Sequence, residues 1–578
     1  MTDQRNLILA IVLSIGIILA FQFFYEVPRM ERVQQQEQLD RTRTTPTPGD
    51  TTTTGDAVTP SPSVPGSAPI QSPEISREQV LSQGTRVEIN NARVHGSFSV
   101  EGARIDNITL ADYRVTTDPN SPEIVLLTPP GTPHTYFAQF GWIPTDASLP
   151  VPTKDTAWQT REAELSPDTP VSMQWDNGAG LSFSRQLALD PNYMFTMTRQ
   201  ITNQSDQAVT LYPYGLISRW GTPTTAGFFV LHEGPIGVFD ETLKEIDYSD
   251  LADDGDQQFI SNGGWIGFTD KYWLTALIPS EPAETTFNFK YVPENNQPRY
   301  QLEMVGGAVT IQPGETFETV DRMFAGAKEV HLLDAYRDTF AIPLFDRAVD
   351  FGWFYFLTKP IFYLLDWLHQ MVGNYGVAIL LLTLIVKLIF FPLANKSYKA
   401  MSKMKALQPE MKKMRERYGD DRAKMNQELM ALYKKEKVNP MAGCLPIVIQ
   451  IPVFFALYKV LLVSIEMRHA PFFGWITDLS APDPTTIFNL FGIIPFDPPS
   501  FLMIGVWPVL MGLTMYLQQK LNPAPADPTQ ARIMMLLPFM FVFLFATFPA
   551  GLVVYWTWNN VLSISQQWVI MRRMGVKA

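Results

Sequence analysis

An apolar stretch from Tyr375 to Lys396, reading YGVAILLLTLIVKLIFFPLANK, constrains the fold more than any other part of the chain. About 20 apolar residues cross the hydrocarbon core of a bilayer, so this stretch predicts a membrane-spanning helix. Its internal cation, Lys387, follows Thr383 by four residues, which places both side chains on one helix face. A charge at that depth costs roughly 2.5–3.5 kcal/mol and usually faces a bundle interior or a wet cavity. A lysine can also extend toward the headgroups, so the stretch alone leaves both interpretations open.

Charge is divided unevenly along the 578 residues, whose formal net charge is −12. Residues 1–335 hold 21 Lys and Arg against 42 Asp and Glu, whereas residues 336–578 hold 24 against 15. The long apolar runs lie at the N-terminus and after Phe351. This division indicates an integral membrane protein with a large acidic soluble domain.

The single cysteine, Cys444, excludes an intrachain disulfide and Cys-rich metal sites. The sequence also lacks the GxxxxGK(S/T) and GxGxxG loops that bind nucleotide phosphates. The histidines of residues 80–335 have no metal-ligand spacing, and no pair of carboxylates stands out as catalytic. We therefore expect no cofactor, no metal ion and no enzymatic activity.

The N-terminal half predicts an anchor, a tether and a β domain. The apolar run from Leu7 to Tyr25 predicts a transmembrane anchor within residues 1–27. A cleaved signal peptide is the alternative, but the run is long for one and no small-x-small cleavage site follows it. Residues 28–79, rich in Thr, Pro and Ser, predict a flexible tether. Residues 80–335 contain short alternating runs between Gly, Pro, Asn and Asp clusters, which predict an all-β sandwich.

Residues 336–373 mix aromatic and charged residues and predict an amphipathic helix that lies in the membrane interface. With helical spacing over residues 343–372, Asp346 and Asp350 share one face. Another face carries the apolar side chains Phe345, Val349, Trp353 and Phe356.

Residues 374–578 form the predicted helical core. A polar insert at residues 396–440 is strongly basic, which places it in the cytoplasm, and a break at Tyr418-Gly419-Asp420-Asp421 predicts a helical hairpin. With the N-terminal anchor, the core helices make six spans, with both termini cytoplasmic and residues 80–335 outside. The predicted core spans are about residues 374–395, 443–464, 501–519, 532–548 and 551–571.

Four methionines align on one face of the first hairpin arm: Met401, Met404, Met411 and Met414. Such a stripe is more often a packing seam between helices. The hairpin has few other large apolar residues, so an adaptable apolar contact surface is the second interpretation.

Three long motifs resemble the YidC family of membrane protein insertases. They read LQPEMKKMRERYGDD, ELMALYKKEKVNPMAGCLPIVIQIPVFFALY and FPAGLVVYW, and the resemblance covers roughly residues 343–573. The order of the segments also resembles the Gram-negative form. The resemblance implies an insertase and chaperone of the bacterial inner membrane. It further implies five core helices around a hydrophilic groove, and a periplasmic β-supersandwich similar to sugar mutarotases.

The resemblance also assigns groove residues. Lys387 and Thr383 match the groove cation and the Thr one turn before it. The family commonly has Arg at the position of Lys387. Lys keeps the positive charge there but lacks the planar guanidinium that pairs with carboxylates. Gln450, Tyr555 and Trp556 match other groove positions, with Trp556 where a second Tyr often stands, and the polar Asn559 is available beside them.

The partners implied by the family are nascent membrane proteins, the Sec translocon, the ribosome, signal recognition components and membrane lipids, with no role for DNA. The basic hairpin suits ribosomal RNA, signal recognition components or lipid headgroups. Its candidate contacts, besides the methionines, are Lys412, Lys413, Arg415 and Arg417.

Two other functions stay open at this point. An intramembrane cation with a polar last helix would suit a secondary transporter, although the sequence contains no inverted repeat. The β domain could instead be a carbohydrate-active domain on a membrane anchor.

Overall fold

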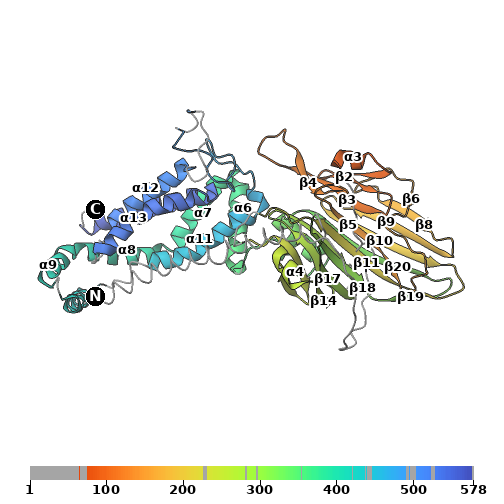
Figure 1. The fold of residues 1–578 in the computed structure, drawn as a ribbon. Helices are drawn as coiled ribbons and strands as arrows, with labels where there is room; N and C mark the ends of the chain where they lie inside the picture. The colour runs from red at the N-terminus through yellow and green to blue at the C-terminus, as the bar shows by residue number, and fades with distance from the viewer. Residues whose placement is uncertain are drawn as a thin grey trace, which may run out of the picture.

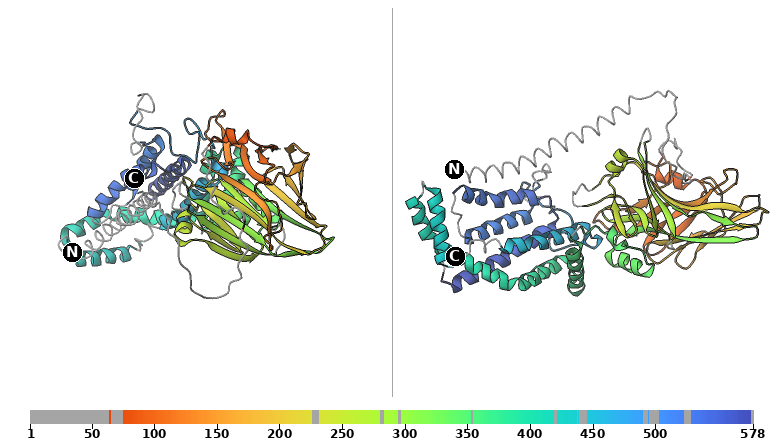
Figure 2. Two further views of the ribbon diagram at one scale, coloured as in Figure 1. Left: turned by 45° about the vertical axis from the view of Figure 1, so that its right-hand side comes forward. Right: turned by 90° about the horizontal axis from the view of Figure 1, so that it is seen from below.

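The computed structural model places a β domain and a helical region end to end (Figures 1 and 2). It describes residues 64, 75–225, 231–279, 283–293, 297–352, 354–418, 421–436, 438, 445–489, 494, 503–522 and 528–575. The predicted anchor at residues 1–27 and most of the predicted tether at residues 28–79 lie outside this part of the chain.

The β domain is a sandwich of two large, mainly antiparallel sheets, which confirms the predicted fold class. Within the described ranges, one sheet has eleven strands and the other has nine. In spatial order the first sheet contains β14 (Gln257–Asn262), β17 (Glu284–Val292), β18 (Arg299–Gly306), β11 (Val209–Trp220), β5 (Tyr136–Pro144), β3 (Arg104–Arg114), β2 (Val94–Ser99), β1 (Arg86–Asn90) and β7 (Glu164–Leu165), with β19 (Val309–Ile311) beside β11 and β4 (Glu123–Leu127) beside β3. The second contains β13 (Thr242–Glu245), β12 (Gly234–Phe239), β15 (Trp265–Thr269), β16 (Trp273–Pro279), β20 (Thr316–Ala327), β10 (Met194–Asn203), β9 (Leu181–Leu189), β8 (Val171–Asp176) and β6 (Gln159–Thr160).

The hairpin of β9 and β10 shows how the sequence specifies this sandwich. Every second residue of β9 is buried, because side chains alternate between the two faces of a strand. The turn is set by Asp190, whose Oδ1 accepts hydrogen bonds from the N–H groups of Asn192 and Met194, each at 2.9 Å. The strand register pairs Phe195 with Leu189, which fixes which face enters the core.

A buried arginine joins the two sheets. Arg199 on β10 is fully buried and forms an ion pair with Asp321 on β20. Its guanidinium also donates to the carbonyl oxygens of Gly141 on β5, at 2.6 Å, and of Tyr214 on β11, at 2.8 Å. One side chain of the second sheet thereby satisfies backbone acceptors of the first.

The helical region follows the sandwich, with short helices α3 (Arg77–Leu81), α4 (Tyr248–Asp254) and α5 (Val330–Thr339) preceding it in the chain. Figures 1 and 2 show its long helices packed side by side, with the C-terminus and α9 at the end remote from the sandwich. Its elements are η2 (Phe345–Ala348), α6 (Tyr355–Val372), α7 (Tyr375–Ile389), α8 (Phe391–Ala406), α9 (Gln408–Tyr418), α10 (Arg422–Lys435), α11 (Leu445–Val463), η4 (Ile465–Met467), α12 (Val506–Leu521), α13 (Pro528–Phe545) and α14 (Ala550–Arg573).

The stretch predicted as one spanning helix at residues 374–395 is instead a bent pair. Helix α7 ends at Ile389 and α8 begins at Phe391, with a bend of 71° between them. Pro392 explains the break, because proline cannot donate to the preceding turn and its ring clashes with it. The predicted boundary between span and hairpin at residue 396 therefore falls inside α8. Among the described helices, no single helix has both the length and the hydropathy expected of a membrane span. Helices α7 and α8 meet the two criteria only when they are taken together.

The predicted interfacial helix at residues 336–373 is shorter than expected. Helix α5 ends at Thr339, and only α6, from Tyr355 to Val372, forms the long helix of this segment. Leu344 and Gly352 have φ angles of 51° and 72°, and this left-handed backbone interrupts a right-handed helix. Asp346 and Asp350 therefore do not share a helix face, and Trp353 lies outside the described residues.

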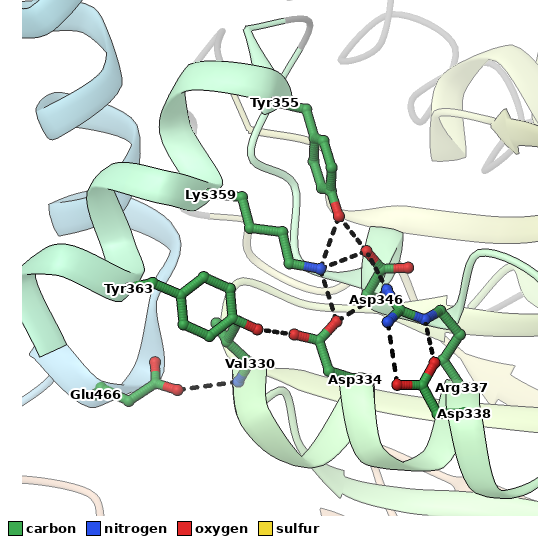
Figure 3. A network of polar contacts seen from close by, with 9 residues as sticks. All are labelled: Val330, Asp334, Arg337, Asp338, Asp346, Tyr355, Lys359, Tyr363 and Glu466. Atoms are coloured by element: carbon green, nitrogen blue, oxygen red, sulfur yellow. Dashed lines mark hydrogen bonds and ion pairs between the residues drawn. The ribbon is translucent and has the colours of Figure 1, made fainter. Parts of the chain in front are cut away.

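Polar contacts join the sandwich to α6 (Figure 3). The ammonium of Lys359 on α6 donates to Asp334 on α5 at 2.6 Å and to Asp346 on η2 at 2.7 Å. Tyr363 donates to Asp334, and Tyr355 donates to Asp346. Lys359 thus holds together two carboxylates that precede α6 in the chain, and the guanidinium of Arg337 also contacts both, at 3.2 Å from Asp334 and 3.4 Å from Asp346.

A second contact reaches the core helices directly. The backbone N–H of Val330, at the start of α5, donates to Oε1 of Glu466 in η4 at 2.9 Å (Figure 3). Lys459, near the end of α11, pairs with Asp350 at 2.8 Å. The end of the sandwich domain is therefore fastened to both α6 and α11.

Candidate functional site

Lys387 lies in the last turn of α7 and faces α14. Its ammonium donates to the hydroxyl oxygen of Ser563 at 2.7 Å, and that hydroxyl donates to the backbone carbonyl of Asn559 at 2.7 Å. An ammonium has three N–H donors, and Ser563 is the one hydrogen-bond partner of Lys387 within the described part of the chain. The cation is therefore turned toward the neighbouring helix.

A small cavity lies beside this cation. Its volume of about 30 Å³ is sufficient for about one water molecule. Lys387, Gln450 and Tyr398 supply the polar groups of its lining, and apolar side chains of α7 and α8 complete it. The structure thus brings Lys387 and Gln450 to one cavity.

Gln450 connects the cavity to α14. Its amide donates to the hydroxyl of Tyr555, whose side chain is buried. Trp556 packs in an aromatic cluster, with ring centroids 4.7 Å from Phe454 and 5.4 Å from Phe545. Tyr555 therefore belongs to the polar network, whereas Trp556 makes apolar ring contacts.

Two further assigned residues have different surroundings. Thr383 is buried, and its hydroxyl donates to the carbonyl of Ile379 in its own helix at 2.7 Å. It does not line the cavity that Lys387 and Gln450 share. Asn559 is 8% exposed, and its side-chain Oδ1 is buried without a hydrogen-bond partner among the described residues. Asn559 can therefore still accept a hydrogen bond, while Thr383 already uses its donor.

Ser563 and Tyr398 lie at the site, although the sequence pattern did not indicate them as site residues. Ser563 follows Asn559 by four residues, so helical spacing could have placed it on the same face of α14. Its contact with Lys387 joins residues 176 positions apart, and no local pattern contains that information. Tyr398 was not considered as a site residue because the predicted hairpin began at residue 396, which assigned Tyr398 to the hairpin instead of the core.

The hairpin forms two helices, α9 and α10, separated at the predicted break. Asp421 caps α10, and its side chain accepts a hydrogen bond from the N–H of Lys424 at 3.0 Å. The cations of α9 are directed to solvent where the structure describes their side chains: Lys412, Lys413 and Arg417 are exposed, and the side chain of Arg415 is outside the description.

The methionine stripe is divided between two helices. Met401 and Met404 lie on α8 and are 7% and 9% exposed, and Met401 packs with Ile570 of α14. Met411 and Met414 lie on α9 and are partly buried, and the hydroxyl of Tyr433 contacts the sulfur of Met411 at 3.6 Å. These contacts favour the packing-seam interpretation for Met401, Met404 and Met411.

The core helices contain cations but no carboxylates. No Asp or Glu occurs within residues 375–406, 445–463, 506–521, 528–545 or 550–573. Lys387 therefore has no counter-charge on the helices around it. In the described ranges, no group of three or more His, Cys, Asp or Glu side chains could hold a metal ion.

Together, the helical bundle with its inward-facing cation and the β-sandwich joined to it define a class of two-part proteins, in which a large β domain is joined to a bundle of apolar helices. The comparisons with known proteins identify the family within this class. A family model described as "60Kd inner membrane protein" matches residues 367–577, and one described as "YidC periplasmic domain" matches residues 86–364.

Full-length relatives agree with the family models. The membrane protein insertase YidC of Beijerinckia indica is 49% identical over 592 residues, which cover 100% of this chain and 97% of the relative. That of Methylorubrum extorquens is 49% identical over 593 residues, which cover 100% and 96%. A crystal structure of an active YidC insertase with its first transmembrane domain resolved is 18% identical, covers 84% of this chain and 92% of that chain, and has a TM-score of 0.36.

The chain belongs to the YidC family of membrane protein insertases. It is therefore a protein of the inner membrane with a periplasmic domain.

Proposed function

We propose that this insertase receives substrates in a hydrophilic groove around Lys387, Gln450, Tyr555 and Asn559, where it also assists their folding. The observation that carries the proposal is the contact between Lys387 and Ser563 beside a polar cavity. A lysine that extended to the headgroups would not need a partner on the neighbouring helix. The contact with Ser563 therefore favours a lysine that faces a groove over a lysine that extends to the headgroups.

The groove addresses the main physical cost of insertion. Moving a polar tail through hydrocarbon leaves its polar groups without hydrogen bonds, at several kcal/mol for each group. Polar side chains within the bundle shorten the apolar distance that remains. Burial of the substrate's own apolar segment, at about 25 cal/mol per Å², then drives the process without nucleotide hydrolysis.

The charge of the groove selects among tails. Lys387 lies among helices without any Asp or Glu, so an acidic tail meets an uncompensated positive charge. Charge interactions in such surroundings are stronger than in water. Because Lys lacks the planar fork of Arg, we expect general attraction of negative charge instead of a two-point carboxylate clamp.

The remaining partners and the topology belong to the same proposal. Six spans would place both termini and the hairpin in the cytoplasm, where exposed Lys412, Lys413 and Arg417 can contact the ribosome, signal recognition components or lipid headgroups. We further propose that the protein works beside the Sec translocon as well as alone, as the resemblance to the family implies.

Substitution of Lys387 tests the proposal. We expect Lys387→Ala to slow insertion of single-span substrates with short acidic tails by roughly tenfold, equivalent to about 1.4 kcal/mol of lost attraction. Lys387→Arg should be tolerated, because it keeps the charge. Insertion is measured in cells depleted of the native protein. Equal insertion by the Ala variant would return Lys387 to a headgroup-directed role.

A further inference from the structure

A second, larger hollow borders Lys387 and is separate from the cavity shared with Gln450. Its volume is about 670 Å³, and it lies between the junction of α7 with α8 on one side and the C-terminal half of α14 on the other. Figure 1 shows that α14 ends, at the C-terminus, in the part of the helical region remote from the sandwich. Under the proposed topology this part is cytoplasmic, and the inference below rests on that topology.

The charged residues that line the hollow are all cationic. Lys387, Lys399 and Arg573 line it, and no acidic residue does. Neither Lys399 nor Arg573 forms an ion pair with any acidic residue that the structure describes, and α7, α8 and α14 contain no Asp or Glu. Like charges around one hollow repel each other, so an anion that enters it relieves this repulsion.

The hollow also has a neutral donor without a partner. Gln566 lines it, and its Nε2 is buried with no hydrogen-bond acceptor among the described residues. A buried donor left unpaired costs about 1–3 kcal/mol. An oxyanion in the hollow would accept from this amide as well as from the cations.

The remaining wall is apolar and exposed. Leu388 is 62% exposed, Phe391 is 48% exposed and Val569 is 41% exposed, and all three line the hollow. A small hydrophilic anion would leave these side chains uncovered. The lining therefore fits a molecule that carries both a negative headgroup and long apolar chains.

We propose that this hollow binds an anionic phospholipid of the cytoplasmic leaflet, with its phosphate among Lys387, Lys399, Arg573 and Gln566. The acyl chains then lie against Leu388, Phe391 and Val569. Basic pockets between helices on the cytoplasmic side are suited to such headgroups. Because Lys387 borders both cavities, the lipid phosphate shares this cation with the substrate groove.

Lipid retention tests the proposal without any substrate. The full chain is placed in nanodiscs of phosphatidylethanolamine and phosphatidylglycerol, and the lipids that it keeps on release are counted by native mass spectrometry. We expect Lys399→Gln with Arg573→Gln to weaken phosphatidylglycerol retention about 30-fold, from roughly 1 kcal/mol for each cation near a bilayer surface. Both substitutions leave Lys387 and the groove contacts in place.

Two control variants make the result specific. Lys154→Gln with Lys244→Gln removes the same charge from exposed positions of the sandwich and should retain the lipid. Lys399→Arg with Arg573→Lys keeps both charges and should also retain it, and melting temperatures show whether each variant folds. Equal retention in wild type and in the variant with Lys399→Gln and Arg573→Gln would overturn the proposal, as would an equal loss in the sandwich control.

A further arm separates a lipid from a substrate tail. Binding of an acidic peptide is measured in wild type and in the variant with Lys399→Gln and Arg573→Gln. If the variant loses peptide binding while its lipid retention stays unchanged, the hollow is assigned to substrates and the lipid proposal is overturned. The groove proposal is tested separately, by measuring whether Lys387→Ala slows insertion.

Discussion

At the scale of single residues, Arg199 shows how the acidic domain holds its two sheets together without a disulfide. We predict that Arg199→Met lowers the free energy of unfolding of the sandwich by about 3–5 kcal/mol, because it leaves Asp321 buried without a charge partner. The carbonyl oxygens of Gly141 and Tyr214 lose a donor as well. Thermal unfolding followed by near-ultraviolet circular dichroism measures the change.

The double variant Arg199→Met with Asp321→Leu is the control for this prediction. Removing both charges of a buried pair often restores much of the stability, since no unpaired charge is left. A single variant that unfolds at the wild-type temperature would show that the inter-sheet contact contributes little.

The sequence predicted some single residues and missed their partners. An intramembrane lysine is conspicuous in an apolar stretch, so Lys387 could be singled out from composition alone. Its partner Ser563 and the buried pair of Arg199 with Asp321 depend on packing between segments more than 100 residues apart. Such contacts follow from the folded structure and not from a local pattern.

At the scale of elements, the junction between the sandwich and α6 depends on Lys359. We predict that Lys359→Met increases amide hydrogen exchange in α5, η2 and the first turns of α6, because Asp334 and Asp346 then lose their shorter shared contact and keep only Arg337, whose guanidinium lies 3.2 Å from Asp334 and 3.4 Å from Asp346. The burial of the three charged groups makes the effect large compared with a surface pair. Hydrogen exchange with mass spectrometry resolves these segments.

Lys154→Gln provides the matched control for the junction. Lys154 pairs with Asp155 on an exposed loop, and such pairs contribute about 0–1 kcal/mol. Exchange at the junction should match wild type in this variant. Unchanged exchange in Lys359→Met would show that apolar packing alone holds the junction.

Glu466 makes the same junction depend on pH. Burial, with the nearby carboxylates Glu329 and Asp366, raises the pKa of Glu466 from its ordinary 4.5 to about 7, although the N–H of Val330 acts in the opposite direction. The folded state therefore keeps a proton that the unfolded state loses between pH 4.5 and 7. Stability from this group is present below pH 4.5 and is lost as pH rises to 7, by roughly 3 kcal/mol.

The variant Glu466→Gln isolates this effect. An amide resembles the protonated acid and does not titrate, so the melting temperature of the variant should fall less than that of wild type between pH 4.5 and 7. Glu241→Gln, at an exposed turn, should keep the wild-type dependence. Parallel curves for wild type and Glu466→Gln would contradict the assignment.

Elements that depend on local patterns could be predicted from the sequence, whereas the bend and the interrupted helix could not. The runs LSFSRQLAL and YMFTMTRQI contain β9 and most of β10, because alternation with period two is a local property. The break near Tyr418 was also predictable from a local pattern, since Gly often ends a helix and Asp often begins one. The bend at Pro392 was missed because the apolar content of the stretch outweighed one proline, and the interfacial helix was extended through the left-handed residues Leu344 and Gly352.

At the scale of the whole molecule, the sandwich and the groove can be separated. We predict that deletion of residues 80–330 leaves most insertion activity, because the groove contacts of Lys387 and Gln450 lie entirely within the helical region. A longer deletion, of residues 80–348, also removes Asp334 and Asp346 from Lys359 and should reduce activity further. Complementation of a depletion strain compares the two. Complete loss in the shorter deletion would assign the essential activity to the sandwich.

The central claim is that substrates enter the bundle beside Lys387. A photo-crosslinking amino acid at position 450 tests it most directly, with position 451 as control, since Gln450 lines the cavity and the adjacent Ile451 is 47% exposed on another face of α11. Ribosome-bound nascent membrane proteins provide the substrate. We expect crosslinks from position 450 to be well above those from position 451, and equal or weaker crosslinking from position 450 would contradict the groove.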